Sequence, residues 1–136
     1  MKRLTLIATS VLLAIGSPAF ADITGLTIDN LGTFSESTGE ARVSGTVTCT
    51  TAVSLRALAG QAHADGSTTV VASSSPGMPC TGSSQPWTVV FPSSPTLFGT
   101  PPPEAGPARC NVTASDSPTP STSMSREEWV DLQPAP

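Results

Sequence analysis

The sequence predicts an all-β fold in which about seven short strands pack as an antiparallel β-sandwich. Several segments alternate apolar and polar residues with a period of two, which is typical of half-buried strands. Glycine, proline, serine and threonine recur between these segments, so turn signals separate them regularly. After residue 21 no stretch keeps a 3.6-residue apolar period for three turns, which argues against long helices and a parallel sheet. A small barrel is the alternative architecture.

The N-terminus has the three parts of a secretory signal peptide, predicted over residues 1–21. Lys2 and Arg3 give a basic start, Leu4 to Ile15 is largely apolar, and Ala19-Phe20-Ala21 fits a signal peptidase site. Cleavage is therefore expected after Ala21. No later segment approaches the roughly 18 apolar residues of a membrane-spanning helix. We expect a secreted, extracellular and soluble product without membrane insertion.

The remaining residues, 22–136, are expected to form one β-sandwich domain with its core at about 38–133. This mature part contains four arginines, no lysine and ten acidic residues, a formal net charge of −6. A nucleic-acid partner needs clustered cations to neutralise phosphates, and four dispersed arginines do not supply them. Composition therefore excludes nucleic acid and disfavours an anionic membrane surface.

The strand predictions follow the alternation of apolar and polar residues along the mature chain. The clearest case is Arg42 to Thr50, because Val43, Val47 and Cys49 share one face and polar side chains share the other. Ala52 to Ala64 contains good helix formers, but Val53, Leu55, Ala57 and Ala59 alternate with other residues, which favours a strand. The other predicted strands are Ile23 to Asp29, Thr68 to Ser73 (at an edge), Trp87 to Phe91, Ala108 to Ala114, and a last strand around Val130 and Leu132.

Turn residues predict how these strands are connected. Asp65-Gly66 suits a tight hairpin turn, and Ser75-Pro76-Gly77 is expected to end the preceding strand. Pro92 to Pro103 reads as a stiff, extended connection because of its prolines, and Asp116 to Ser125 reads as a mobile Ser/Thr/Pro loop.

Three cysteines, Cys49, Cys80 and Cys110, leave the disulfide pairing open. In an oxidising compartment two should pair. Cys49 and Cys110 both face inward by parity, which favours their pairing. In an immunoglobulin-like strand order, however, the second strand runs antiparallel to the fifth in one sheet, so the end of the Cys49 strand lies near Cys80. We favour Cys49–Cys80, with Cys49–Cys110 as the alternative. Cys110 is then a small buried apolar residue, and a dimer through its thiol is the competing interpretation.

The segments around these cysteines also resemble a known family. The string Val43-Ser44-Gly45-Thr46-Val47-Thr48-Cys49-Thr50 is followed by Cys80-Thr81-Gly82 and by Pro86-Trp87-Thr88-Val89. This pattern is similar to a family of small secreted actinobacterial immunoglobulin-like domains of unknown function. The resemblance spans roughly Thr38 to Leu132, implies an immunoglobulin-like sandwich with Cys49 paired to Cys80, and brings no catalytic or binding residues. Cys110 departs from the family pattern.

A search for catalytic or metal-binding patterns finds little. His63 is the sole histidine, and with Asp65 and the many serines a hydrolytic triad is formally possible, but no G-x-S-x-G elbow is present. We therefore interpret His63 as a surface residue beside the hairpin turn. Zinc-binding spacings are absent. Neighbouring strand residues point to opposite faces, so Glu127 and Glu128 are interpreted as solvated charges rather than a glycosidase pair.

Two further groups of residues carry weaker functional hypotheses. Asp22, Asp29, Glu36 and Glu40 could meet at one end of the sandwich and bind calcium, but no D-x-D-x-D-G loop supports this. Trp129 has the opposite parity to Val130 and Leu132. Packing under the Asp116–Ser125 loop is the favoured interpretation, and an exposed contact for sugars or proteins is the alternative.

Taken together, these features predict a non-enzymatic domain that binds an extracellular or cell-wall partner, without a cofactor or metal. We expect a monomer whose contacts come from the end loops Pro92–Pro103 and Asp116–Ser125, with Trp129 and His63 as candidate surface contacts. A structural, envelope-associated protein without a ligand is one alternative, and a small hydrolase around His63 is another.

Overall fold

The computed structural model describes residues 23–116 and 123–135, so the predicted signal peptide and residues 117–122 of the predicted loop lie outside it. The described residues confirm the all-β prediction. They form eight strands of one sheet and a 3-10 turn, η2 (Leu97–Gly99). The strands are β1 (Ile23–Ile28), β2 (Leu31–Phe34), β3 (Ala41–Cys49), β4 (Val53–Ala62), β5 (Thr68–Met78), β6 (Ser84–Phe91), β7 (Gly106–Asp116) and β8 (Ser123–Pro134).

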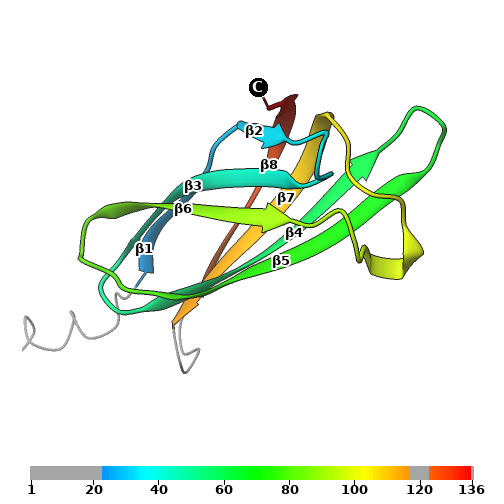
Figure 1. Cartoon of the computed structure of the whole chain (residues 1–136). Helices are drawn as coiled ribbons and strands as arrows, with labels where there is room; N and C mark the ends of the chain where they lie inside the picture. Colours follow the sequence, from blue (N-terminus) through cyan, green and yellow to red (C-terminus); the bar gives the residue numbers. More distant parts are fainter. Residues whose placement is uncertain (1–22, 117–122, 136) are drawn as a thin grey trace, which may run out of the picture.

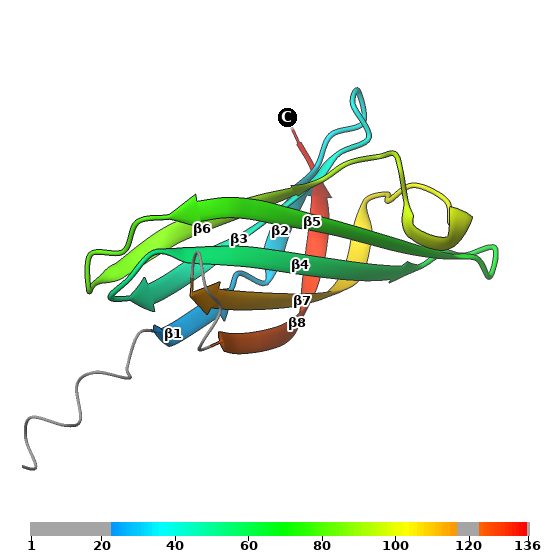
Figure 2. The same ribbon diagram turned by 90° about the horizontal axis from the view of Figure 1, so that it is seen from below.

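The sheet consists of two antiparallel halves. In one half β3 pairs with β1, β2 and β6, and in the other half the order is β5-β4-β7-β8. The short strand β2 joins the halves, because it also pairs with β8 in parallel. Figure 2 shows β5, β4, β7 and β8 side by side in front of β3 and β6. The sheet is therefore mixed, although most of its ladders are antiparallel.

One hydrophobic core lies between the two halves (Figure 1). A cavity of about 10 Å³ is lined by β3, β4, β5, β6, β7 and β8 together, which shows that the halves face each other with almost no empty space. The core side chains are small or β-branched for the most part, as expected from a chain without tyrosine. Trp87 and Phe91 from β6 and Phe34 from β2 are its largest members, and the Trp87 indole Nε1 donates to the carbonyl of Thr46 at 3.1 Å.

The core begins earlier in the chain than residue 38, because Leu26 and Phe34 are buried. Phe34 belongs to β2, a strand that the sequence did not predict. This strand has four residues, too few for alternation to be recognised, and it contains Gly32. An added Cβ at Gly32 would lie 2.6 Å from the carbonyl oxygen of Arg42, so the glycine permits the close approach of β2 to β3.

Strand β5 continues to Met78, so the prediction that Ser75-Pro76-Gly77 ends it is wrong. The reason is its place at an edge of the sheet, where Pro76 does not have to donate a hydrogen bond to a second neighbour. Strand β6 has an open edge as well. The carbonyl of its Val90 points away from β3 and accepts from Ser73 Oγ at 2.7 Å. Pro86 lies four residues earlier on the strand, so its backbone nitrogen points to the same open edge. Prolines therefore occupy the open edges of β5 and β6.

The β4–β5 hairpin has the turn that Asp65-Gly66 predicted. Gly66 has a φ of 91°, a conformation that glycine adopts without strain. The amide of His63 donates to the carbonyl of Ser67 at 2.9 Å, which closes the turn. The Ser67 hydroxyl and amide donate to Asp65 Oδ1 at 2.6 and 2.9 Å, and these two bonds lower the pKa of Asp65.

Candidate functional site

The half of the sheet formed by β5, β4, β7 and β8 turns one face to the core and the other to solvent, and Figure 2 looks onto the solvent side. Register places the solvent-facing residues in rows across the four strands. One row is Val70, Gly60, Arg109 and Trp129, and the next is Ala72, Leu58, Asn111 and Glu127. Two more rows, built from Arg56, Thr113 and Ser125 and from Ser54, Ser115 and Ser123, complete the surface that we call the outer face.

Trp129 is the largest exposed side chain of the outer face, with 60% of its surface accessible. The favoured prediction that it packs under a loop is therefore wrong, and the alternative of an exposed contact stands. Its neighbour on β7 is Arg109. The Arg109 guanidinium lies 5.7 Å from the centroid of the Trp129 ring and also donates to Glu127 Oε1 at 3.0 Å. Because all three side chains are exposed, each contact is worth at most about 1 kcal/mol. This cluster orients the indole but does not bury it.

Beside this cluster lies an open depression of about 280 Å³, which we call the trough. Leu58, Gly60 and Val70 form its apolar floor on β4 and β5, and Leu58 is an exposed large hydrophobic residue. Arg109, Asn111 and Glu127 form its wall on β7 and β8, mostly through apolar atoms. The surface of the trough is thus largely apolar, and few polar atoms are exposed within it.

A second depression, of about 550 Å³, lies further along the same strands. We call it the serine basin because hydroxyl groups dominate its lining. Arg56 supplies a positive charge there, and Asp116, which is a buried residue at the end of β7, supplies a negative one. The remaining lining residues are Ser54, Leu55, Ser74, Ser75, Thr113 and Ser115.

His63 lies in a different environment from the one predicted. Its side chain is only 8% exposed, so its interpretation as a surface contact is wrong. Nδ1 lies 2.6 Å from Glu104 Oε1, and Nε2 lies 2.5 Å from Thr69 Oγ1. Asp65, the partner considered from the sequence, is engaged by Ser67 instead. The physical reason is that the chain around Pro101 to Glu104 lies against the hairpin, where Glu104 contacts Nδ1 and the carbonyls of Pro101 and Pro102 hold the Thr69 hydroxyl next to Nε2.

A hydroxyl, an imidazole and a carboxylate in series have the composition of a hydrolytic triad. Here the hydroxyl is not available to a substrate, because Thr69 is 1% exposed and its Oγ1 donates to the carbonyls of Pro101 and Pro102 at 2.8 and 3.1 Å. Because the Thr69 hydroxyl donates to main-chain carbonyls, its proton is not directed at Nε2. The arrangement therefore has the hydrogen-bond direction of a clasp rather than that of an activated nucleophile.

The clasp fixes the segment 96–104, which we call the strap, against the hairpin. Thr100 Oγ1 accepts from the amide of Val70 at 3.0 Å, and the side chain of Gln61 exchanges two hydrogen bonds with the backbone of Glu104, at 2.7 and 2.9 Å. Most of the predicted end loop Pro92–Pro103 is thus held in place. Its exposed tip is Phe98, which has a φ of 58° within η2.

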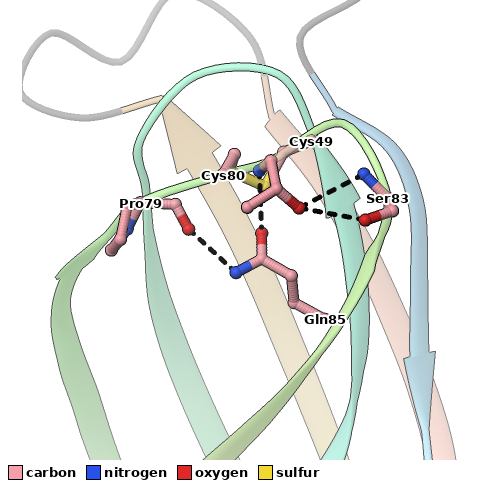
Figure 3. Close-up of a disulfide and its surroundings, with 6 residues drawn as sticks. Cys49, Pro79, Cys80, Ser83 and Gln85 are labelled. Atoms are coloured by element: carbon pink, nitrogen blue, oxygen red, sulfur yellow. Dashed lines mark hydrogen bonds between the residues drawn. A yellow bond between two sulfur atoms is a disulfide. The ribbon is translucent and has the colours of Figure 1, made fainter.

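The disulfide joins Cys49 to Cys80, with 5.3 Å between the Cα atoms, which confirms the favoured pairing. Figure 3 shows the polar contacts around it. Gln85 Nε2 donates to the carbonyl of Pro79 at 2.9 Å, and the Thr81 amide donates to Gln85 Oε1 at 3.2 Å. Cys110 is the free cysteine and is buried in the core, where burial raises the pKa of its thiol to about 11. A dimer through Cys110 would require this thiol to leave the core.

The described residues contain no group of three or more His, Cys, Asp or Glu side chains that would suit a metal ion. Of the four calcium candidates, Asp29, Glu36 and Glu40 are among the described residues and form no such group. Asp22 lies outside the described residues. Within residues 23–116 and 123–135, no helix is long and apolar enough to cross a membrane.

Comparison of the chain with protein-family models, with curated proteins and with solved structures gave no match in any of the three.

Proposed function

We propose that this protein is a secreted, non-enzymatic immunoglobulin-like domain that binds an extracellular or cell-wall partner through the outer face. The observation that carries the proposal is Trp129, a large aromatic side chain that remains exposed beside an open trough. Exposed tryptophans with arginine neighbours are common at the centres of binding surfaces. The rigid sheet beneath holds these side chains in place without an ordering cost at each encounter.

The strand pairing supports the immunoglobulin-like assignment and the resemblance noted in the sequence. Strands β3 and β6 pair as the second and fifth strands of an immunoglobulin-like domain do. Strands β4, β7 and β8 pair as the strands of the other sheet of that domain do. The parallel β2–β8 ladder is a departure, because it connects the two halves. The disulfide supports export, since such bonds persist in oxidising compartments.

The proposal is tested with the mature chain, residues 22–136, immobilised and incubated with culture supernatant and cell-wall fragments of the producing organism. We expect a retained partner whose recovery falls at least tenfold for Trp129→Ala. Leu31→Ala is the matched control, because Leu31 is also 60% exposed but lies on β2, in the other half of the sheet. Equal recovery by all three proteins, or by none, contradicts binding through the outer face. Firm wall retention that ignores Trp129 would favour the structural, ligand-free alternative.

A hydrolase is the second candidate, and the series Thr69–His63–Glu104 is the observation in its favour. It would require the strap to open, because Thr69 is buried and its hydroxyl donates to main-chain carbonyls. A screen against ester, peptide and glycoside substrates tests it, with His63→Ala as the control. Turnover that His63→Ala abolishes would replace the binding proposal with an enzymatic one.

A further inference from the structure

Gly60 has no structural reason to be a glycine. It lies inside β4, where glycine weakens a strand relative to residues with a side chain. An added Cβ would meet its nearest atom, the carbonyl oxygen of Thr69, at 4.0 Å, an ordinary contact. Gly32 and Gly45 differ in this respect, because there an added Cβ would collide with backbone oxygens at 2.6 and 1.9 Å. The missing side chain at Gly60 keeps the floor of the trough open. This would explain the glycine by space for a ligand rather than by a requirement of folding.

The trough suits a ligand with an apolar ring face and polar edges. Leu58 and Val70 offer apolar surface to such a ring, and Trp129 lies one strand beyond the Arg109 wall. Few polar atoms are exposed within the trough, so a bound ring would reach the donors of Arg109, the acceptors of Glu127 and the amide of Asn111 at its edges. Sugar rings have this combination of an apolar face and a rim of hydroxyl groups.

The serine basin extends the same pattern along the strands. From Gly60 to Ser54 the outer face runs six residues, about 20 Å at the usual rise of a strand. Along β4 the outward residues change from Gly60 and Leu58 to Arg56 and Ser54, and Ser54 lies in one row with Ser115. Serine and threonine hydroxyls both donate and accept, as the hydroxyls of a sugar do. A surface of this length accommodates a chain of sugar units rather than one ring.

Charge decides which chain of sugars fits. Each depression contains one cation and one anion: Arg109 with Glu127 in the trough, and Arg56 with Asp116 in the basin. The rest of the mature chain is acidic, which repels polyanions. We propose, on the basis of the function above, that the outer face binds an uncharged polysaccharide laid along β4, with one ring in the trough over Gly60.

The test uses affinity gel electrophoresis of the mature chain in gels that contain β-glucan, xylan, galactomannan or dextran, and pull-down with insoluble cellulose and chitin. Alginate at low and high salt serves as the charged comparison. We expect retardation or retention by at least one uncharged polymer, and at least tenfold weaker binding for Gly60→Val and for Trp129→Ala. Leu31→Ala should bind like the wild type. Gly60→Val should also unfold at an equal or higher denaturant concentration, so its lost binding cannot come from misfolding.

Three results overturn this inference: no uncharged polymer is bound, alginate alone is bound, or Gly60→Val binds as well as the wild type. The proposed binding function is tested separately by the capture of a partner from culture supernatant and cell-wall fragments. Trp129-dependent recovery of another partner would keep the binding function and reject the polysaccharide. Failure of both experiments would reject both.

Discussion

Alkaline pH is expected to destabilise this protein through one buried thiol. Burial raises the pKa of Cys110 in the folded chain to about 11, from an ordinary value of 9.0. Between these two values the unfolded chain loses the thiol proton while the folded chain keeps it. The unfolded state therefore binds fewer protons, and the free energy of unfolding falls as the pH rises. At about 1.4 kcal/mol for each pKa unit, the loss from pH 8 to pH 11 is about 2–3 kcal/mol.

The composition makes this effect easy to isolate. The sequence contains no tyrosine, and its one lysine, Lys2, belongs to the predicted signal peptide. Cys49 and Cys80 are joined in a disulfide and do not titrate. Cys110 is thus the one side chain of the mature sequence whose ordinary pKa lies close to this alkaline range.

The assay is guanidinium unfolding of the oxidised mature chain at pH 8, 9.5 and 11, followed by circular dichroism. Cys110→Ala is the control: its stability is expected to differ from the wild type by a constant at low pH and to stay level where the wild type falls. Mass spectrometry of each sample verifies that the Cys49–Cys80 bond has survived. If the two proteins lose the same stability between pH 8 and pH 11, the reasoning about Cys110 is refuted.

Three further predictions concern the other elements of the fold. Alkylation of the unfolded, non-reduced mature chain should label one thiol per molecule, Cys110, and two or more labelled thiols would contradict the disulfide. The double substitution Cys49→Ser with Cys80→Ser should lower the free energy of unfolding by about 3–4 kcal/mol. Trp87→Ala should cost about 3–5 kcal/mol in denaturant unfolding, against less than about 1 kcal/mol for Trp129→Ala, and equal costs would mean that their burial has been misjudged. Glu104→Ala should speed amide exchange at Val70 and Thr100 by removing the partner of His63, whereas Glu36→Ala should leave exchange there unchanged.

Most strands could be predicted because their two faces have different environments. In β4 the buried residues Val53, Leu55, Ala57 and Ala59 alternate with outward ones, and this alternation outweighed the helical propensity of the segment. The disulfide followed from the expected strand order instead, since pairing of β3 with β6 brings the end of one strand beside the start of the other, whereas parity alone favoured Cys49–Cys110. Strand β2 was missed because four residues carry too little pattern.

The candidate site was harder to predict, because it depends on contacts between strands that are distant in sequence. Alternation alone placed Leu58 and Gly60 on the face opposite the core, but nothing in the sequence showed that Arg109 and Trp129 lie in the same row. The burial of His63 depends on the strap, whose residues come about 40 positions later. The signal for the exposed tryptophan is its parity, because Trp129 alternates with Val130 and Leu132 of the buried face.

The protected edges of the sheet affect how molecules of this protein contact one another. Pro76 and Pro86 remove amide donors at β5 and β6, and Arg126 Nε donates to the carbonyl of Leu26 at 3.0 Å on β1, the remaining terminal strand. These features interrupt the rows of backbone groups with which a strand from a second molecule would pair. Crowded molecules of this protein would consequently touch through side chains rather than fuse into continuous ladders. Such encounters reverse easily, so the protein should remain dispersed at high concentration while its outer face stays accessible.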